Sequence, residues 1–180
     1  MEERLAGPVF ACAVIMPPRE RAIPGVADSK VLSPAQRERL ATLIRAHALA
    51  WSLGAASVRE VERHNILQAT VRAIRRALLR LPLRPDAVLL DGNPLRWLEI
   101  PHQAIVGGDA KCYSIACASI LAKVARDRLM RSLDGRHPGY GWDHNAGYGT
   151  AEHREAIEER GLTAHHRRSF VIPEQIPLAL

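Results

Sequence analysis

Residues 103–133 read QAIVGGDAKCYSIACASILAKVARDRLMRSL. The pattern predicts a short apolar strand, then a turn at Gly107-Gly108-Asp109, and then a long helix over about 113–133. The segment before it has the same design, because the apolar residues 87–90 lead directly into Asp91-Gly92-Asn93. Strands that alternate with helical patterns are typical of α/β folds, in which chemistry usually lies beyond the carboxyl ends of the strands.

The rest of the chain fits this fold class. Ser33 and Ser57 each begin a capping box, which predicts that a helix starts just after each serine. Asn65 is expected to cap a further helix that ends before Pro82. The other predicted elements are strands over 5–16 and 50–56, helices over about 34–48 and 151–160, a loop over 137–150 and an extended tail over 164–180. We therefore expect an α/β architecture in one domain.

The composition excludes several classes of protein. Of the 180 residues, 47% are hydrophobic and 24% are charged, a globular mixture that excludes wholesale disorder and a fibrous chain. No apolar run reaches the roughly 20 residues of a membrane-spanning helix, and the pattern of a signal peptide is absent. The three cysteines form no Cys-x-x-Cys pair, so we expect free thiols in a reducing compartment and a cytoplasmic protein. The net charge of +6 suits a polyanion such as nucleic acid.

Asp91 and Asp109 are candidate metal ligands. Asp91 follows an apolar strand and Asp109 lies between a Gly-Gly pair and a long helix, so both carboxylates are held on rigid elements. Hard oxygen ligands suit Mg²⁺ or Mn²⁺, and a pair of such ions activates water at a phosphodiester. The alternative is that both residues only cap turns, as Asp often does.

Two further segments carry residues that suit nucleic acid. The Gly-Tyr-Gly units within 139–149 would present aromatic rings to a sugar or base, although the spacing alone favours a packed turn. His165–Ser169 is a cationic run able to hold phosphates, although a solvated charged surface is the ordinary explanation of such a run. The histidines match no zinc-finger spacing, and Gly-x-Ser-x-Gly, the motif of a nucleophilic serine, is absent.

Ordered motifs run through nearly the whole chain. They are Leu5–Val9, Asp28–Lys30, Leu32–Pro34, Ala56–Ser57, Asn65–Leu67, Ala69–Thr70, Leu90–Asn93, Gly108–Lys111, Ala118–Val124, Arg126–Met130, Pro138–Gly141, Gly147–Thr150, Glu152–His153 and His166–Phe170. In these residues the chain resembles bacterial ribonuclease HII, the type 2 ribonuclease H. The block over 109–130 is the most specific part of the resemblance.

The resemblance implies a ribonuclease H-like fold, with a mixed central sheet flanked by helices and a helical C-terminal portion. It implies a single domain, 1–180, with a sheet-and-helix core over about 1–135 and a C-terminal substrate-binding segment over about 136–180. It also implies a monomeric endonuclease that cuts RNA in RNA–DNA hybrids and at ribonucleotides embedded in duplex DNA. The implied mechanism is two-metal-ion hydrolysis with Mn²⁺ or Mg²⁺.

The resemblance also assigns roles to single residues. The family holds its metals with four carboxylates, of which Asp91 matches the third and Asp109 the fourth. Tyr148 matches the tyrosine that packs at the RNA–DNA junction and helps to read the 2′-hydroxyl, the group that distinguishes RNA from DNA. The further substrate contacts that it implies are Ser29, Lys30, Lys111, Ser114, Arg167 and Arg168.

The chain departs from the family pattern at two places. The family has an Asp-Glu pair and a Gly-Arg-Gly segment just before Leu-Ala-Gly-Pro, and that pair supplies the first two carboxylates. Here Met1–Arg4 precedes Leu5. We therefore expect an N-terminally truncated or altered member, and the alternative function is hybrid binding without catalysis. Asp143–Ala146 stands where the family is usually more basic, which predicts weaker phosphate contacts.

Overall fold

The computed structural model describes residues 3–18 and 22–171. These residues divide into two compact units. We call Phe10–Ala56 with Thr70–Ala125 the sheet unit, and Met1–Val9 with Ser57–Ala69 and Arg126–Leu180 the terminal unit. The terminal unit combines two segments from early in the chain with the residues from Arg126 onward.

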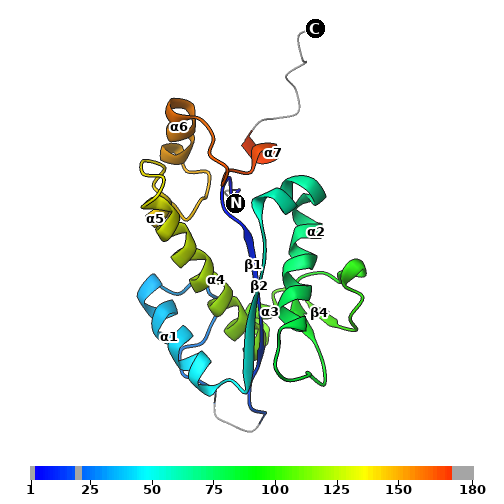
Figure 1. The fold of residues 1–180 in the computed structure, drawn as a ribbon. Helices are drawn as coiled ribbons and strands as arrows, with labels where there is room; N and C mark the ends of the chain where they lie inside the picture. Colours follow the sequence, from blue (N-terminus) through cyan, green and yellow to red (C-terminus); the bar gives the residue numbers. More distant parts are fainter. Residues whose placement is uncertain (1–2, 19–21, 172–180) are drawn as a thin grey trace. The chain divides into compact units, whose positions relative to one another are not determined.

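The sheet unit is built on two neighbouring strands, β1 (Val9–Ile15) and β2 (Ala50–Ala56). They run in opposite directions, as Figure 1 shows, and the N–H of Leu49 donates to the carbonyl of Ile15 over 2.9 Å. Every second residue of β2 is buried, beginning with Ala50. Gly54 is one of these buried positions, and a Cβ there would lie 2.0 Å from the carbonyl oxygen of Ala73. Helix α2 therefore packs directly on the backbone of β2.

Helices α1 and α2 begin where the caps predict, and the first part of α2, up to Ala69, belongs to the terminal unit. Helix α1 (Pro34–His47) starts after Ser33 with both hydrogen bonds of a capping box. Helix α2 (Val58–Leu79) follows Ser57, whose N–H donates to the Glu60 carboxylate over 2.9 Å. Asn65 interrupts α2 with a positive φ of 66°, and its side chain accepts from the N–H of Gln68. The predicted cap at Asn65 is thus confirmed, and it divides one helix into two.

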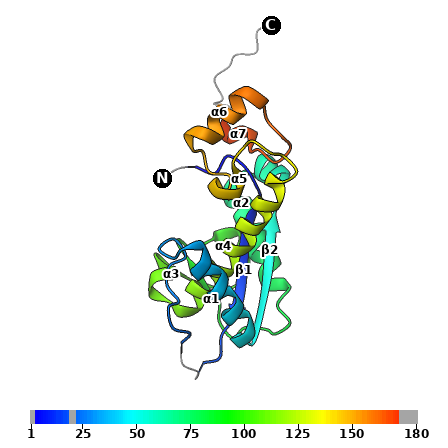
Figure 2. The same ribbon diagram turned by 90° about the vertical axis from the view of Figure 1, so that its left-hand side faces the viewer.

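The main core of the sheet unit lies between α1 and α4 (Tyr113–Asp134), whose residues 113–125 belong to this unit. The two helices lie beside β1 and β2 (Figure 2). The buried members of this core are Ile23, Leu40, Ala41, Ile44, Cys117, Ile120, Leu121 and Val124. Tyr113 fixes the loop before α1, because its hydroxyl accepts from the N–H of Ile23 over 2.9 Å.

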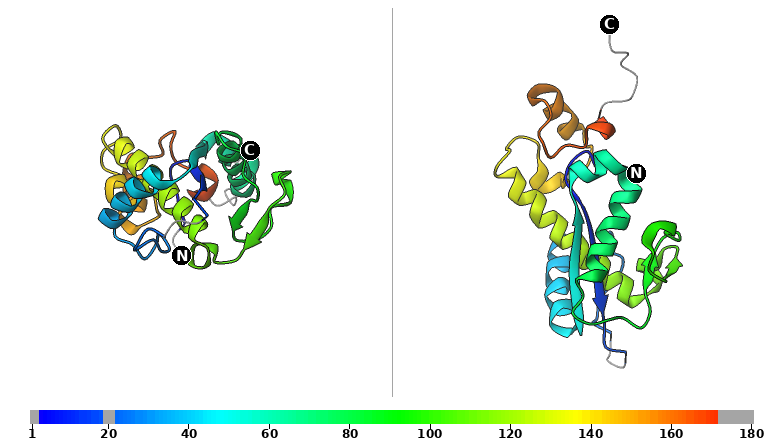
Figure 3. Two further views of the ribbon diagram at one scale, coloured as in Figure 1. Left: turned by 90° about the horizontal axis from the view of Figure 1, so that it is seen from below. Right: turned by 45° about the vertical axis from the view of Figure 1, so that its right-hand side comes forward.

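A second ladder in the sheet unit consists of β3 (Leu89–Asp91) and β4 (Gln103–Ile105), which are parallel and are drawn in green in Figure 3. The 3-10 helix η1 (Arg96–Leu98) connects them, and the short helix α3 (Gly108–Lys111) follows β4. The α/β fold class is confirmed. Within the described residues the strands form two ladders of two strands each, where one central sheet was expected.

The terminal unit is organised around the segment Leu5–Gly7. The N–H groups of Leu5 and Ala6 donate to the carbonyl of Gly147, and the carbonyl of Leu5 accepts from Arg167 over 2.7 Å. Three short helices belong to this unit, namely α5 (Trp142–Asn145), α6 (Ala151–Arg160) and α7 (Arg168–Val171). The helical C-terminal portion is confirmed. Helix α7 occupies part of the tail that was expected to be extended, and 172–180 lie outside the described residues.

A buried arginine ties these segments of the terminal unit together. Arg126 is 2% exposed, and its guanidinium donates to the carbonyls of Ala6, Pro8 and Ala146 over 2.8–3.0 Å. Gly7 has a φ of +85°, and a Cβ there would lie 2.7 Å from that guanidinium. No helix among residues 3–18 and 22–171 is long and apolar enough to span a membrane.

Candidate active site

Asp91 and Asp109 are brought together at the carboxyl ends of β3 and β4. The parallel register pairs Asp91 with Ile105, and the N–H of Gly92 closes the ladder on the Ile105 carbonyl. Shortly after β4 ends at Ile105, the N–H of Gly108 donates to Asp91 Oδ1 over 2.7 Å. The side chain of Asp91 is therefore bound to the backbone N–H of the residue that precedes Asp109.

Gly108 lies close to both Asp91 and helix α4. A Cβ at this position would lie 2.7 Å from Cδ1 of Ile115 and 3.4 Å from Asp91 Oδ1. A side chain at position 108 would therefore need Ile115 to move, whereas Gly107 has a positive φ of 65°, which favours glycine.

Asp109 carries most of the buried charge of this region. It is only 7% exposed, and its Oδ2 accepts a hydrogen bond from Lys30 Nζ over 3.2 Å. Lys30 Nζ also lies 3.8 Å from Asp28 Oδ1. The hydrogen bond that Lys30 donates to Asp109 raises the pKa of Lys30, and the charges of Asp28 and Asp91 act in the same direction. Two carboxylates therefore lie within 4 Å of one ammonium, and the charge of Asp91 acts on it as well, so the region attracts positive charge.

The remaining predicted contacts of the sheet unit have partners inside it. The hydroxyl of Ser29 is buried and shares a hydrogen bond of 2.9 Å with Ser119. Lys111 Nζ donates to the carbonyl of Val106 over 2.6 Å, and the side chain is exposed. Ser114 Oγ lies 3.3 Å from Cys112 Sγ. Lys30 and Lys111 thus remain at the surface, whereas the Ser29 hydroxyl is occupied within the unit.

Two carboxylates alone do not make a closed metal cage. Within the ranges 3–18 and 22–171, no group of three or more His, Cys, Asp or Glu side chains is arranged to hold a metal ion. Asp91 and Asp109 still offer hard carboxylate oxygens on rigid backbone, and Mg²⁺ is usually bound by one or two carboxylates together with water and substrate phosphate. The residues present fit that kind of site.

Tyr148 lies in the terminal unit, in the Gly147-Tyr148-Gly149 turn. Its hydroxyl accepts a hydrogen bond of 2.7 Å from Arg4, and the Arg4 guanidinium carbon lies 5.0 Å from the ring centroid. The N–H of Gly149 donates to the carbonyl of Glu3. Residues just before Leu5 are thus the immediate neighbours of Tyr148, a contact that sequence reasoning missed. No local pattern signals it, because Arg4 and Tyr148 are 144 residues apart.

The cationic run at the C-terminal end does not form one surface patch. Arg167 is 3% exposed, and its Nε donates to the carbonyl of Gly7 over 2.9 Å. Burial lowers its pKa to about 10. Arg168 is exposed, so only this second arginine has the surface position that the sequence suggested.

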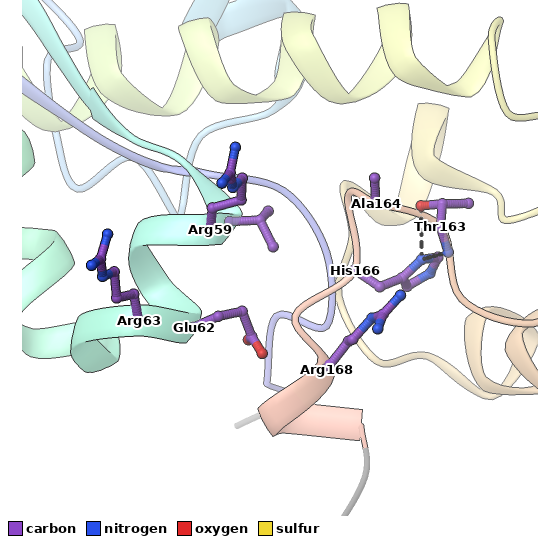
Figure 4. Close-up of a pocket in the computed structure, with 8 residues that line it drawn as sticks. Arg59, Glu62, Arg63, Thr163, Ala164, His166 and Arg168 are labelled. Carbon is purple, nitrogen blue, oxygen red and sulfur yellow. Dashed lines mark hydrogen bonds between the residues drawn. The ribbon is translucent and has the colours of Figure 1, made fainter.

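Arg168 lines an open pocket of about 500 Å³ in the terminal unit (Figure 4). Glu62 in the same pocket accepts hydrogen bonds from the N–H and hydroxyl of Ser169. Figure 4 shows Arg59 and Arg63 pointing away from Glu62. The arginines of this pocket therefore do not converge on one point.

Comparison with known proteins agrees with the fold. The family model for ribonuclease HII matches residues 4–172. The curated ribonuclease HII of Chromobacterium violaceum is 53% identical over 167 residues, which are 92% of this chain and 84% of that protein. The crystal structure of ribonuclease H2 from Pyrococcus horikoshii OT3 superposes with a TM-score of 0.79 at 24% identity, over 92% of this chain and 88% of that one.

A second solved structure, the PCNA:RNase HII complex from Archaeoglobus fulgidus, contains a chain that matches with a TM-score of 0.78 at 25% identity. That match covers 98% of this chain and 96% of the other. The family match spans nearly the whole chain, and it includes both acidic strand ends and the Tyr148 turn. The chain belongs to the ribonuclease HII family.

Proposed function

We propose that this protein cleaves RNA at ribonucleotides embedded in duplex DNA and in RNA–DNA hybrids, with Asp91 and Asp109 as ligands of Mg²⁺ or Mn²⁺. Family membership shows that the protein is an endoribonuclease of the ribonuclease H type. The assignment of particular residues, the two-metal mechanism and the preference for single ribonucleotides are the proposal.

One observation carries the metal assignment. The hydrogen bond from Gly108 to Asp91 holds one carboxylate against the backbone of the residue that precedes the other, and the ammonium of Lys30 is already drawn to Asp109. Such an anionic, rigid pair is what a divalent cation needs from a protein. A bound ion there would polarise a phosphodiester and activate water.

Different residues of the chain would then bind the metal, the phosphate groups and the ribose. Asp91 and Asp109 would hold positive charge beside the scissile phosphate. Lys30 and Lys111, both exposed, would meet phosphate oxygens. Tyr148 would pack against the ribose and favour a sugar with a 2′-hydroxyl. A monomer in the cytoplasm is part of the same proposal.

The second candidate function is hybrid binding without cleavage. It is favoured by the number of ligands within the described residues, where no group of three or more His, Cys, Asp or Glu side chains is arranged to hold a metal ion. Two carboxylates can hold an ion together with its waters, but two ions in line with a phosphate need more ligands.

Metal binding tests the assignment directly. We expect Mn²⁺ titration, followed by the electron spin resonance signal of free Mn²⁺, to show binding that Asp91→Asn and Asp109→Asn each weaken at least about tenfold, because each removes a charged ligand. Asp86→Asn is the matched control, since Asp86 is an exposed carboxylate of the same unit. Equal Mn²⁺ affinity for all four chains would refute the metal assignment.

A further inference from the structure

A buried cluster of aromatic and imidazole rings lies directly behind the Tyr148 turn, within the terminal unit. Trp142 and His153 are 0% exposed and His166 is 2% exposed. The indole ring lies 5.2 Å from the His166 ring and 6.1 Å from the His153 ring, measured between centroids. Burying two imidazoles is costly unless their nitrogens are hydrogen-bonded, so the bonds that they make indicate what the cluster does.

The donor and the acceptor of each hydrogen bond in this cluster follow from the groups at its two ends. The backbone N–H of Thr163 donates to His166 Nδ1 over 2.9 Å, a bond drawn in Figure 4, so the proton of neutral His166 is on Nε2. His166 Nε2 lies 3.1 Å from His153 Nε2. The indole N–H of Trp142 also donates to His153 Nε2, over 3.0 Å. His153 Nε2 is therefore the acceptor of both bonds.

His153 must then carry its proton on Nδ1, and this nitrogen lies 2.7 Å from the carbonyl oxygen of Tyr148. The last bond of the chain is thus a donation from His153 Nδ1–H to the main chain of Tyr148. Burial lowers the pKa of both histidines, that of His166 to about 4, and the charges of His137 and His165 act on His166 in the same direction. The neutral forms that this chain of bonds needs are therefore the stable ones near neutral pH.

The same turn has other partners. The side chain of Asn145 accepts from the N–H of Gly147 over 2.8 Å, Arg154 Nε donates to the carbonyl of Gly149 over 3.1 Å, and the N–H of Thr150 donates to the carbonyl of Tyr148 over 2.9 Å. The bond from His153 is the shortest of these and comes from a fully buried side chain. Gly147 has a φ of +79°, and a Cβ there would lie 2.8 Å from the carbonyl oxygen of Ala6. The turn is therefore tightly fitted on one side and bound to the ring cluster on the other.

We propose that His153, held by Trp142 and His166, is a positioning residue that fixes the Tyr148 main chain and thereby sets the discrimination between ribose and deoxyribose. The proposal rests on the proposed role of Tyr148 in reading the ribonucleotide. His153 itself does not touch the substrate. Its effect is to keep the tyrosine ring in one place before the nucleic acid arrives, so that binding does not have to order it.

Two polar substitutions of His153 separate its two hydrogen bonds. His153→Asn keeps an N–H near the position of Nδ1 and loses the acceptor at Nε2. His153→Gln places its amide near Nε2 and offers no donor at the Nδ1 position. Both variants lose one imidazole and one set of bonds, so each controls for the general cost of changing the cluster.

The first readout is the ratio of dissociation constants for an all-DNA duplex and the same duplex with one ribonucleotide, measured by fluorescence anisotropy without divalent metal. We expect His153→Asn to keep the ratio of the unchanged chain and His153→Gln to reduce it about fivefold, the effect of one lost hydrogen bond. Trp142→Phe, which leaves the bond to Tyr148 intact, should lower the melting temperature and keep the ratio. A ratio that falls equally in both His153 variants, or in neither, would overturn the proposal.

The second readout does not depend on nucleic acid. The ¹⁹F resonance of 3-fluorotyrosine at position 148, assigned by its loss in Tyr148→Phe, should broaden or split in His153→Gln and stay single in His153→Asn. An unchanged resonance in His153→Gln would refute the positioning role. If the resonance responds but Tyr148→Ala leaves the dissociation-constant ratio unchanged, the positioning role stands and the proposed reading of the ribonucleotide by Tyr148 is wrong.

Discussion

Acidification should destabilise this protein through the buried His166, and the effect can be calculated. An unfolded histidine titrates with a pKa near 6.5, whereas burial lowers that of His166 to about 4. As the pH falls from 6.5 toward 4, His166 binds a proton in the unfolded chain but stays neutral in the folded chain. The free energy of unfolding therefore decreases through this window and recovers above it.

The magnitude follows from the two pKa values. Between about pH 7 and about pH 4.5, the difference in proton uptake at this one site amounts to roughly 2 to 3 kcal/mol. His166 is 2% exposed, so solvent does not screen this effect appreciably. The lowered pKa of His153 adds to the loss of stability in the same direction.

His166→Gln isolates the contribution, because it removes the titrating group and keeps an amide N–H near the Nε2 position. We expect the variant to be less stable than the unchanged chain near neutral pH, by about 1 kcal/mol for the lost acceptor of the Thr163 bond. Between about pH 7 and about pH 4.5, the free energy of unfolding of this variant should fall by roughly 2 to 3 kcal/mol less than that of the unchanged chain. Urea unfolding at about pH 7, 6, 5 and 4.5 measures both chains, and the carboxylates that titrate in the same range are common to them. Parallel losses in the two chains would show that His166 is not held neutral by the fold.

Other predictions concern single contacts. Tyr148→Ala should reduce the preference for ribonucleotide-containing duplex and leave the slope of affinity against salt unchanged, because the slope counts phosphate contacts; fluorescence anisotropy at several salt concentrations checks this, and an unchanged preference would contradict it. Lys30→Ala should raise Mn²⁺ affinity about threefold, since an exposed ammonium competes weakly for Asp109, and a lower affinity by calorimetry would contradict it. Gly54→Ala should cost about 3 kcal/mol by urea unfolding, because its Cβ would overlap the backbone of α2. Gly135→Ala is the control and should be nearly neutral, because its Cβ would make an ordinary contact of 3.8 Å with the carbonyl oxygen of Ser132.

Local signals in the sequence predicted most of the helices and the acidic strand ends. The capping boxes at Ser33 and Ser57 are short-range patterns, and both helices start as predicted. The meeting of Asp91 with the residue before Asp109 was also accessible, because parallel strands end at one edge of a sheet. The pairing of the strands into two ladders could not be predicted from the sequence, since strand pairing depends on long-range contacts.

The sequence predicted side-chain environments less well. Arg167 lies in a run of basic residues that is typical of a surface, and it is buried because the carbonyl of Gly7 binds its guanidinium. Arg4 meets Tyr148 across 144 residues. His153 and His166 lie 13 residues apart and contact each other directly, and Trp142 of α5 also donates to His153 of α6. Each of these contacts joins segments that no periodic pattern relates.

Cleavage of a duplex that carries one ribonucleotide, with Mn²⁺ or Mg²⁺, tests the central claim that Asp91 and Asp109 serve metal-dependent hydrolysis. The 180-residue chain is compared with its Asp91→Asn and Asp109→Asn variants, and with Asp86→Asn as the control. We predict metal-dependent cleavage by the unchanged chain and by Asp86→Asn, and loss of cleavage in the other two variants. Cleavage that survives Asp91→Asn or Asp109→Asn would contradict the assignment of that carboxylate, and a chain that binds the duplex without cleaving it would contradict the proposed hydrolysis.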